Sequence, residues 1–331
     1  MFFFPYRADI KLDSWPVLTI LLCVLCLVVF YFQTANERKV ERATRRFCAE
    51  AQPRAFRLAV NTVYGDTSEQ RCIQVMLGMH IAKDQQRFLR ETAAGGRTLA
   101  GLSREQSDQF VTKAFADQYV DFANQVPKHL TRQLWYQPAS WNVLHMITAA
   151  IAHGSWGHVL GNLVFFFAFE ATLELLLGGL VYVAVLAALA MLSHSVYSLA
   201  MFATADALPT VGLSGVVYGV MALFVFFLPR TPIRCFAWIV IFFKRFSIPA
   251  WTLLVGFAGF DTYTLLSDGN TSNINLAAHV GGAGFGYLLG VALFRAKRDS
   301  VRKLASLGDG TPGDPAEQAA GNWWEERKRK W

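Results

Sequence analysis

Six stretches of the chain are almost continuously hydrophobic, and a long polar block separates the first of them from the second. The stretches cover residues 15–32, 159–177, 180–203, 212–228, 249–267 and 275–294. Each has about the 17–25 residues that an α-helix needs to cross a bilayer. We therefore predict an all-α membrane protein with six transmembrane helices.

The polar block, residues 33–140, shows apolar residues three or four positions apart in three places. These patterns cover 36–60, 68–92 and 103–125, and the spacing is typical of amphipathic helices. We expect two or three helices there, which makes the block a large helical loop. The predicted order is a leader (1–14), a first transmembrane helix (15–32), a helical insert (33–140), a five-helix core (141–295) and a tail (296–331).

The composition agrees with a membrane protein, and the basic residues indicate which ends of the helices face the cytoplasm. Of 331 residues, 53% are hydrophobic and only 17% are charged, whereas soluble domains have about 25% charged residues. Basic clusters lie at 230–234, 244–245 and 295–303, and such clusters are retained in the cytoplasm. The leader and tail are then cytoplasmic and the insert extracytoplasmic. This accounts for the net charge of +7 without nucleic acid as a partner.

Two details of the extramembrane segments stay open at this stage. Cys48 and Cys72 are the only cysteines of the insert, and they form either a disulfide in an oxidising compartment or two buried free thiols. Residues 230–248, rich in Phe, Trp and Arg, are expected to form a surface or re-entrant stretch.

No cysteine or histidine spacing resembles a zinc site, and we expect no metal and no cofactor.

Two catalytic-type residues occupy equivalent places in different hydrophobic segments. Ser214 and His279 each stand sixteen positions before a basic residue, Arg230 and Arg295. Two helices crossing in the same direction place both about 24 Å from that end. A serine and a histidine at equal depth are a nucleophile and the base that activates it. The alternative is a packing serine and a histidine that is merely hydrogen-bonded within the bundle.

Neighbouring residues favour the catalytic interpretation. Gly212 and Gly215 flank Ser214 and allow close approach of another chain. Glycines at four-residue spacing provide a small-residue face on both segments, a pattern that lets helices pack closely. His158 and Asn162, four apart at the outer end of the second segment, offer donors for a developing oxyanion.

Three motifs resemble the rhomboid family of intramembrane serine proteases. They are H-x-x-x-x-H-x-x-x-N from His153 to Asn162, G-x-S-G-x-x-Y-G from Gly212 to Gly219, and A-H-x-x-G-x-x-x-G from Ala278 to Gly286. Their order on the second, fourth and sixth segments also fits. The resemblance covers residues 141–295 and the first hydrophobic segment, and implies a rhomboid-like bundle of six transmembrane helices.

The resemblance implies a Ser214–His279 catalytic dyad without an acidic third member. It also implies that Tyr218 stacks on His279, and that His158, Asn162 and the Ser214 N–H hold the oxyanion, supported by His153. Glu174 is similar to a structural glutamate of the family. Asp261 is expected to pair helices rather than to complete a triad, and the role of Glu170 is not indicated.

The implied function is an endopeptidase that cleaves transmembrane helices of membrane-protein substrates. The expected location is the bacterial inner membrane, with an active site opening to the extracytoplasmic side; the oligomeric state is not indicated. The alternative is a non-proteolytic rhomboid-like protein that binds membrane clients.

The sequence departs from the rhomboid pattern in two ways, both in the loop before the second hydrophobic segment. This loop is far longer than in minimal members of the family, and the Trp-Arg pair often found there has no clear counterpart.

Overall fold

The computed structural model describes residues 2–10, 14–82, 84–204, 207–239, 242–268 and 275–307. The chain divides into two compact units. The membrane unit comprises Met1–Cys26 and Tyr136–Trp331, and the insert unit comprises Leu27–Trp135. Of the predicted tail, residues 308–331 lie outside the described residues.

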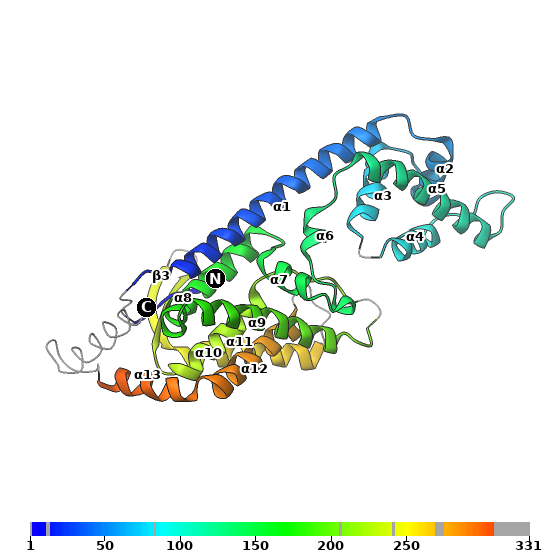
Figure 1. The fold of residues 1–331 in the computed structure, drawn as a ribbon. Helices are drawn as coiled ribbons and strands as arrows, with labels where there is room; N and C mark the ends of the chain where they lie inside the picture. Colours follow the sequence, from blue (N-terminus) through cyan, green and yellow to red (C-terminus); the bar gives the residue numbers. More distant parts are fainter. Residues whose placement is uncertain are drawn as a thin grey trace. The chain divides into compact units, whose positions relative to one another are not determined.

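All six predicted hydrophobic segments contain helices (Figure 1). These are α1 (Val17–Ala49), α8 (Trp156–Leu177), α9 (Gly179–Ala200), α10 (Ser214–Phe227), α11 (Ala250–Asp268) and α12 (Leu276–Leu293). In the described part of the chain, α1, α8, α9 and α12 are long and apolar enough to cross a membrane, and α10 is a shorter apolar helix. The prediction of an all-α membrane bundle is confirmed. The same unit also contains the helices α7 (Val143–Ile151) and α13 (Arg295–Leu307) and the 3-10 turn η1 (Pro138–Ser140).

The closest helix packing in the membrane unit is between α10 and α12. A Cβ atom added at Gly282 would collide with the carbonyl oxygen of Gly215, and one added at Gly286 with that of Gly219. The two glycine faces therefore bring the two backbones into direct contact, which is what small residues at four-residue spacing allow. This contact places the first turn of α10 beside the first turn of α12.

The beginning of α1 is tied to the end of α8 by one carboxylate. Glu174 accepts hydrogen bonds from the backbone N–H groups of Leu18, at 2.9 Å, and Thr19, at 2.7 Å, and from the Thr19 hydroxyl at 2.7 Å. The first N–H groups of a helix have no partner within it, so Glu174 satisfies those of Leu18 and Thr19 from 156 and 155 positions away in the sequence. Gly178, with φ +81°, makes the turn between α8 and α9.

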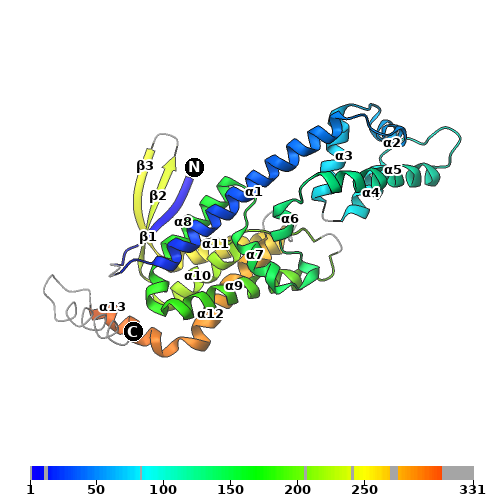
Figure 2. The ribbon, with the colours of Figure 1, turned by 45° about the horizontal axis from the view of Figure 1, so that its top comes forward.

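A small sheet, which the sequence interpretation missed, joins the first residues of the chain to the region before α11. The strands β1 (Phe2–Ala8), β2 (Pro232–Ile239) and β3 (Phe242–Pro249) are antiparallel in the order β1-β2-β3 (Figure 2). Alternate residues of β2, namely Ile233, Cys235 and Ala237, are buried, as the period of two in a strand requires. The expected surface stretch 230–248 is therefore a hairpin, and the leader adds a third strand.

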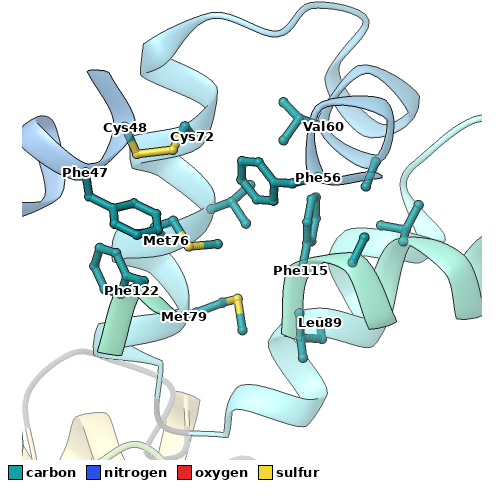
Figure 3. Packing of buried hydrophobic residues seen from close by; sticks show 14 of the residues in the cluster. Phe47, Cys48, Phe56, Val60, Cys72, Met76, Met79, Leu89, Phe115 and Phe122 are labelled. Carbon is teal, nitrogen blue, oxygen red and sulfur yellow. A yellow bond between two sulfur atoms is a disulfide. The ribbon is translucent and has the colours of Figure 1, made fainter. Parts of the chain in front are cut away.

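The insert unit is helical, with its own hydrophobic core (Figure 3). Its helices are the end of α1, α2 (Arg54–Tyr64), α3 (Glu69–Ile81), α4 (Gln85–Ala94), α5 (Arg104–Gln125) and α6 (Leu130–Leu134). Cys48 and Cys72 form a disulfide that links the end of α1 to α3. At the start of α5, Ser103 and Gln106 form a reciprocal capping box, which satisfies two amides that lack partners.

Candidate active site

Ser214 lies at the first residue of α10, on a segment held from two sides. The residue pair Tyr136 and Thr210 exchanges two backbone hydrogen bonds of 2.9 Å, and the Gly212 N–H donates to the Ala149 carbonyl at 2.8 Å. Gly212 has φ +127°, a conformation that favours glycine. A Cβ there would also collide with the His158 ring. The chain therefore reaches α10 on a fixed path, and Ser214 stands at the positive end of the helix dipole.

His279 lies one turn into α12 and contacts Ser214. Its Nε2 atom is 2.8 Å from the Ser214 Oγ atom. The start of α12 is capped by Asn275, whose side chain accepts from the Ala278 N–H at 3.0 Å. Gly215, the residue after Ser214, packs against Ser193 of α9 and the Ala278 carbonyl, with no room for a side chain. The close α10–α12 packing thus sets the serine–histidine distance.

Tyr218 holds the imidazole ring from one face. Its ring lies 4.4 Å from that of His279, centroid to centroid, with an interplanar angle of 12°. Tyr218 is one turn after Ser214 on α10, so both residues point toward α12. The stacked ring restricts rotation of the imidazole while leaving its two nitrogens available for hydrogen bonds.

A cavity of about 360 Å³ opens beside Ser214 and His279. Its lining includes His158, Asn162, Phe165, Tyr218, Met221, Phe257 and Asn275. Among the described atoms, the buried side-chain nitrogen of Asn162 has no hydrogen-bond partner. His153 does not line the cavity; it is buried and packs edge-on against the His158 ring, with centroids 5.2 Å apart.

The part of the chain that forms this site matches a known family. The Rhomboid domain model covers residues 140–296, which include α7 to α12. This part of the chain is a rhomboid domain. A comparison with curated proteins found no match. Within the rhomboid domain, the histidine and asparagine of α8, the serine and tyrosine of α10, and the histidine of α12 surround one cavity.

Asp261 was not expected in this site, yet it reaches the second nitrogen of the imidazole. Its Oδ2 atom is 2.6 Å from His279 Nδ1. The sequence showed an isolated carboxylate in the fifth hydrophobic segment, and helix pairing was the favoured interpretation. The contact does join α11 to α12, but it does so through the histidine that also contacts Ser214. The rhomboid domain therefore places Ser214, His279 and Asp261 in one chain of hydrogen-bonding contacts.

Sequence reasoning also missed Asn275, whose capping bond and place in the cavity lining are described above. An Asn directly before a hydrophobic segment is a signal for a helix start, and it would have identified the cap. In the described part of the chain, no group of three or more His, Cys, Asp or Glu side chains lies close enough together to hold a metal ion.

Proposed function

We propose that this rhomboid domain is an intramembrane serine endopeptidase with Ser214 as nucleophile and His279 as general base. The observation that carries the proposal is the 2.8 Å separation between Ser214 Oγ and His279 Nε2, beside a cavity in a bundle of apolar helices. A serine hydroxyl is a weak nucleophile, and an adjacent base is what activates it.

The proposed reaction follows from the positions of the donors and acceptors. The Ser214 Oγ atom attacks the carbonyl carbon of a substrate peptide bond while its proton moves to His279 Nε2. Asn162, His158 and the Ser214 N–H at the start of α10 stabilise the oxyanion. The imidazolium then protonates the leaving nitrogen, and a water molecule, deprotonated by the same imidazole, hydrolyses the acyl-enzyme.

The substrates we propose are transmembrane segments of other membrane proteins. Peptide bonds inside a helix are shielded by hydrogen bonds along the backbone, so a substrate must unwind locally to enter a 360 Å³ cavity. Small or helix-breaking residues near the cleaved bond lower the free-energy cost of unwinding. The cavity residues His158 and Asn162 are polar enough to admit the water that the second half-reaction needs.

For orientation, we propose that the six helical segments cross a bacterial inner membrane, with leader and tail in the cytoplasm. Support comes from the basic residues Arg230, Arg234, Lys244 and Arg245, which follow α10 and precede α11 and favour the cytoplasmic side. Ser214 lies at the opposite end of α10 from Arg230. The cavity then opens toward the extracytoplasmic side, and the insert lies on that side too.

A comparison of cells producing wild-type protein with cells producing Ser214→Ala tests this function. We expect extracytoplasmic fragments of single-span membrane proteins to be shed only with the wild type. Ser195→Ala is the matched control, because Ser195 Oγ is bonded to a carbonyl of its own helix, at 2.8 Å from Met191 O, and should leave shedding unchanged. Equal shedding by wild type and Ser214→Ala would refute the protease and favour a client-binding protein.

A further inference from the structure

We infer that Asp261 is the positioning residue of a Ser214–His279–Asp261 catalytic triad, an inference that rests on the proposed function. The three residues come from three helices: α10, α12 and α11. The contacts are 2.8 Å from Ser214 Oγ to His279 Nε2 and 2.6 Å from His279 Nδ1 to Asp261 Oδ2. The two ring nitrogens thus have one partner each, one a nucleophile and the other a carboxylate.

These partners fix the position of the proton on the imidazole. An ionised carboxylate only accepts hydrogen bonds, so the nitrogen facing Asp261 must carry the hydrogen. Neutral His279 is therefore protonated on Nδ1, and its Nε2 lone pair accepts from the Ser214 hydroxyl. This is the tautomer that a general base needs, and without a carboxylate at Nδ1 the opposite tautomer competes.

The surroundings strengthen the contact between Asp261 and His279. The two side chains are 11% and 9% exposed, so little water screens the interaction. Tyr218, whose ring stacks on His279, also interacts electrostatically with the Asp261 carboxylate. Asp261 and the His279 ring therefore share Tyr218 as a neighbour.

In the reaction, Asp261 stabilises charge without changing its own protonation state. The Ser214 proton moves from Oγ to Nε2 as the Oγ–carbon bond forms, and the Nδ1 proton stays in place. The imidazolium then lies against a carboxylate and forms an ion pair only at that stage. An interaction that strengthens in the transition state accelerates the reaction itself.

The first test compares the phosphonylation of Ser214 by a fluorophosphonate probe in purified full-length wild type, Asp261→Asn and Thr262→Val. Thr262→Val is the matched control, since Thr262 Oγ1 donates to Ala258 O of its own helix. We expect Asp261→Asn to lower the maximal rate of phosphonylation by about 10²- to 10⁴-fold, with little change in probe affinity. A role in helix pairing alone would lower the unfolding temperature and leave that rate within threefold of wild type.

The second test does not depend on whether Asp261→Asn folds. The tautomer of His279 is measured by ¹⁵N NMR in wild-type protein labelled at histidine, with His279→Ala used to assign the signal. We expect protonation on Nδ1 and a far-downfield proton bonded to it. Protonation on Nε2 would overturn the inference.

If wild type shows no phosphonylation at Ser214, the proposed function fails and the inference fails with it. If wild type reacts and Asp261→Asn matches it, only the inference fails.

Discussion

Two buried histidines, one in each unit, differ in what their ring nitrogens contact. His80 in the insert unit and His279 in the rhomboid domain are 6% and 7% exposed, so burial does not distinguish them. His80 Nε2 donates to the Pro127 carbonyl at 2.9 Å, and its Nδ1 is 3.1 Å from the Tyr119 hydroxyl. His279 lies between a serine hydroxyl and a carboxylate instead.

This difference in partners distinguishes a structural histidine from the histidine that we propose transfers a proton. A backbone carbonyl has no proton to give and no negative charge to stabilise an imidazolium. Burial accordingly lowers the pKa of His80 and favours the neutral ring. At His279, in the mechanism that we propose, the serine supplies a proton and the carboxylate stabilises the imidazolium that forms. His279 also lines a cavity, whereas the rings of Tyr119 and Phe122 pack around His80.

The largest expected effect is on activity, and it should fall on one histidine only. His279→Ala removes the proposed base and should lower the rate of fluorophosphonate labelling at least about 10⁴-fold, as losing the catalytic histidine does in other serine proteases. His80→Gln keeps a polar side chain in the insert and should leave the rate within a fewfold of wild type. Comparable losses in both variants would show that the two histidines are not functionally different.

Next in size is the effect of the disulfide, which should be confined to the insert unit. Replacing Cys48 and Cys72 together with alanine removes a crosslink across 24 residues. This should cost about 3 kcal/mol of unfolding free energy. Amide hydrogen exchange in full-length protein should speed up in α2 and α3. Cys23→Ala, a free cysteine in α1, is the control, and unchanged exchange in the double variant would contradict the prediction.

A third prediction tests whether the helix contact sets the geometry of the rhomboid domain. Gly286→Ala forces a methyl group against the Gly219 carbonyl, while Gly284→Ala meets no atom within 4 Å. Overpacking should cost about 1–3 kcal/mol and lower the midpoint of thermal unfolding in detergent, together with the labelling rate. Gly284→Ala should match wild type. Equal midpoints for both variants would mean that α10 and α12 are less closely packed than described.

The smallest effect concerns pH. Burial is the main cause of the lowered pKa of His80, and nearby Arg132 adds to it, while the bond to Pro127 opposes it. The unfolded chain therefore binds more protons at His80 than the folded one. The insert should lose stability as pH falls below about 6.5. Hydrogen exchange in α3, corrected for intrinsic rates, should show this loss, and His80→Gln should reduce it. An identical pH dependence in that variant would exclude His80 as the cause.

The sequence predicted those parts of the molecule in which a polar residue interrupts an apolar segment. Ser214 and His279 stood out in this way, and the equal spacing to Arg230 and Arg295 already suggested a common depth. The helices of the membrane unit were predictable for a different reason. Their long apolar segments have few alternatives to an α-helix in lipid.

What the sequence did not predict depends on how helices and strands are rotated and paired in space. Asp261 was visible as a carboxylate, but whether it faced His279 depends on the rotation of α11 about its axis. The β1–β2 pairing joins residues more than 220 positions apart, and no local pattern reports such a contact. The Cys48–Cys72 pair was left open because pairing requires suitable geometry as well as two cysteines.

The central claim, that His279 activates Ser214, is tested most directly by locating the probe on the protein. Purified full-length protein is treated with a fluorophosphonate, digested, and the modified residue is identified by tandem mass spectrometry. We predict a single adduct on Ser214 that forms in wild type and is lost in His279→Ala. An adduct on another serine, or one on Ser214 that forms equally fast without His279, would contradict it.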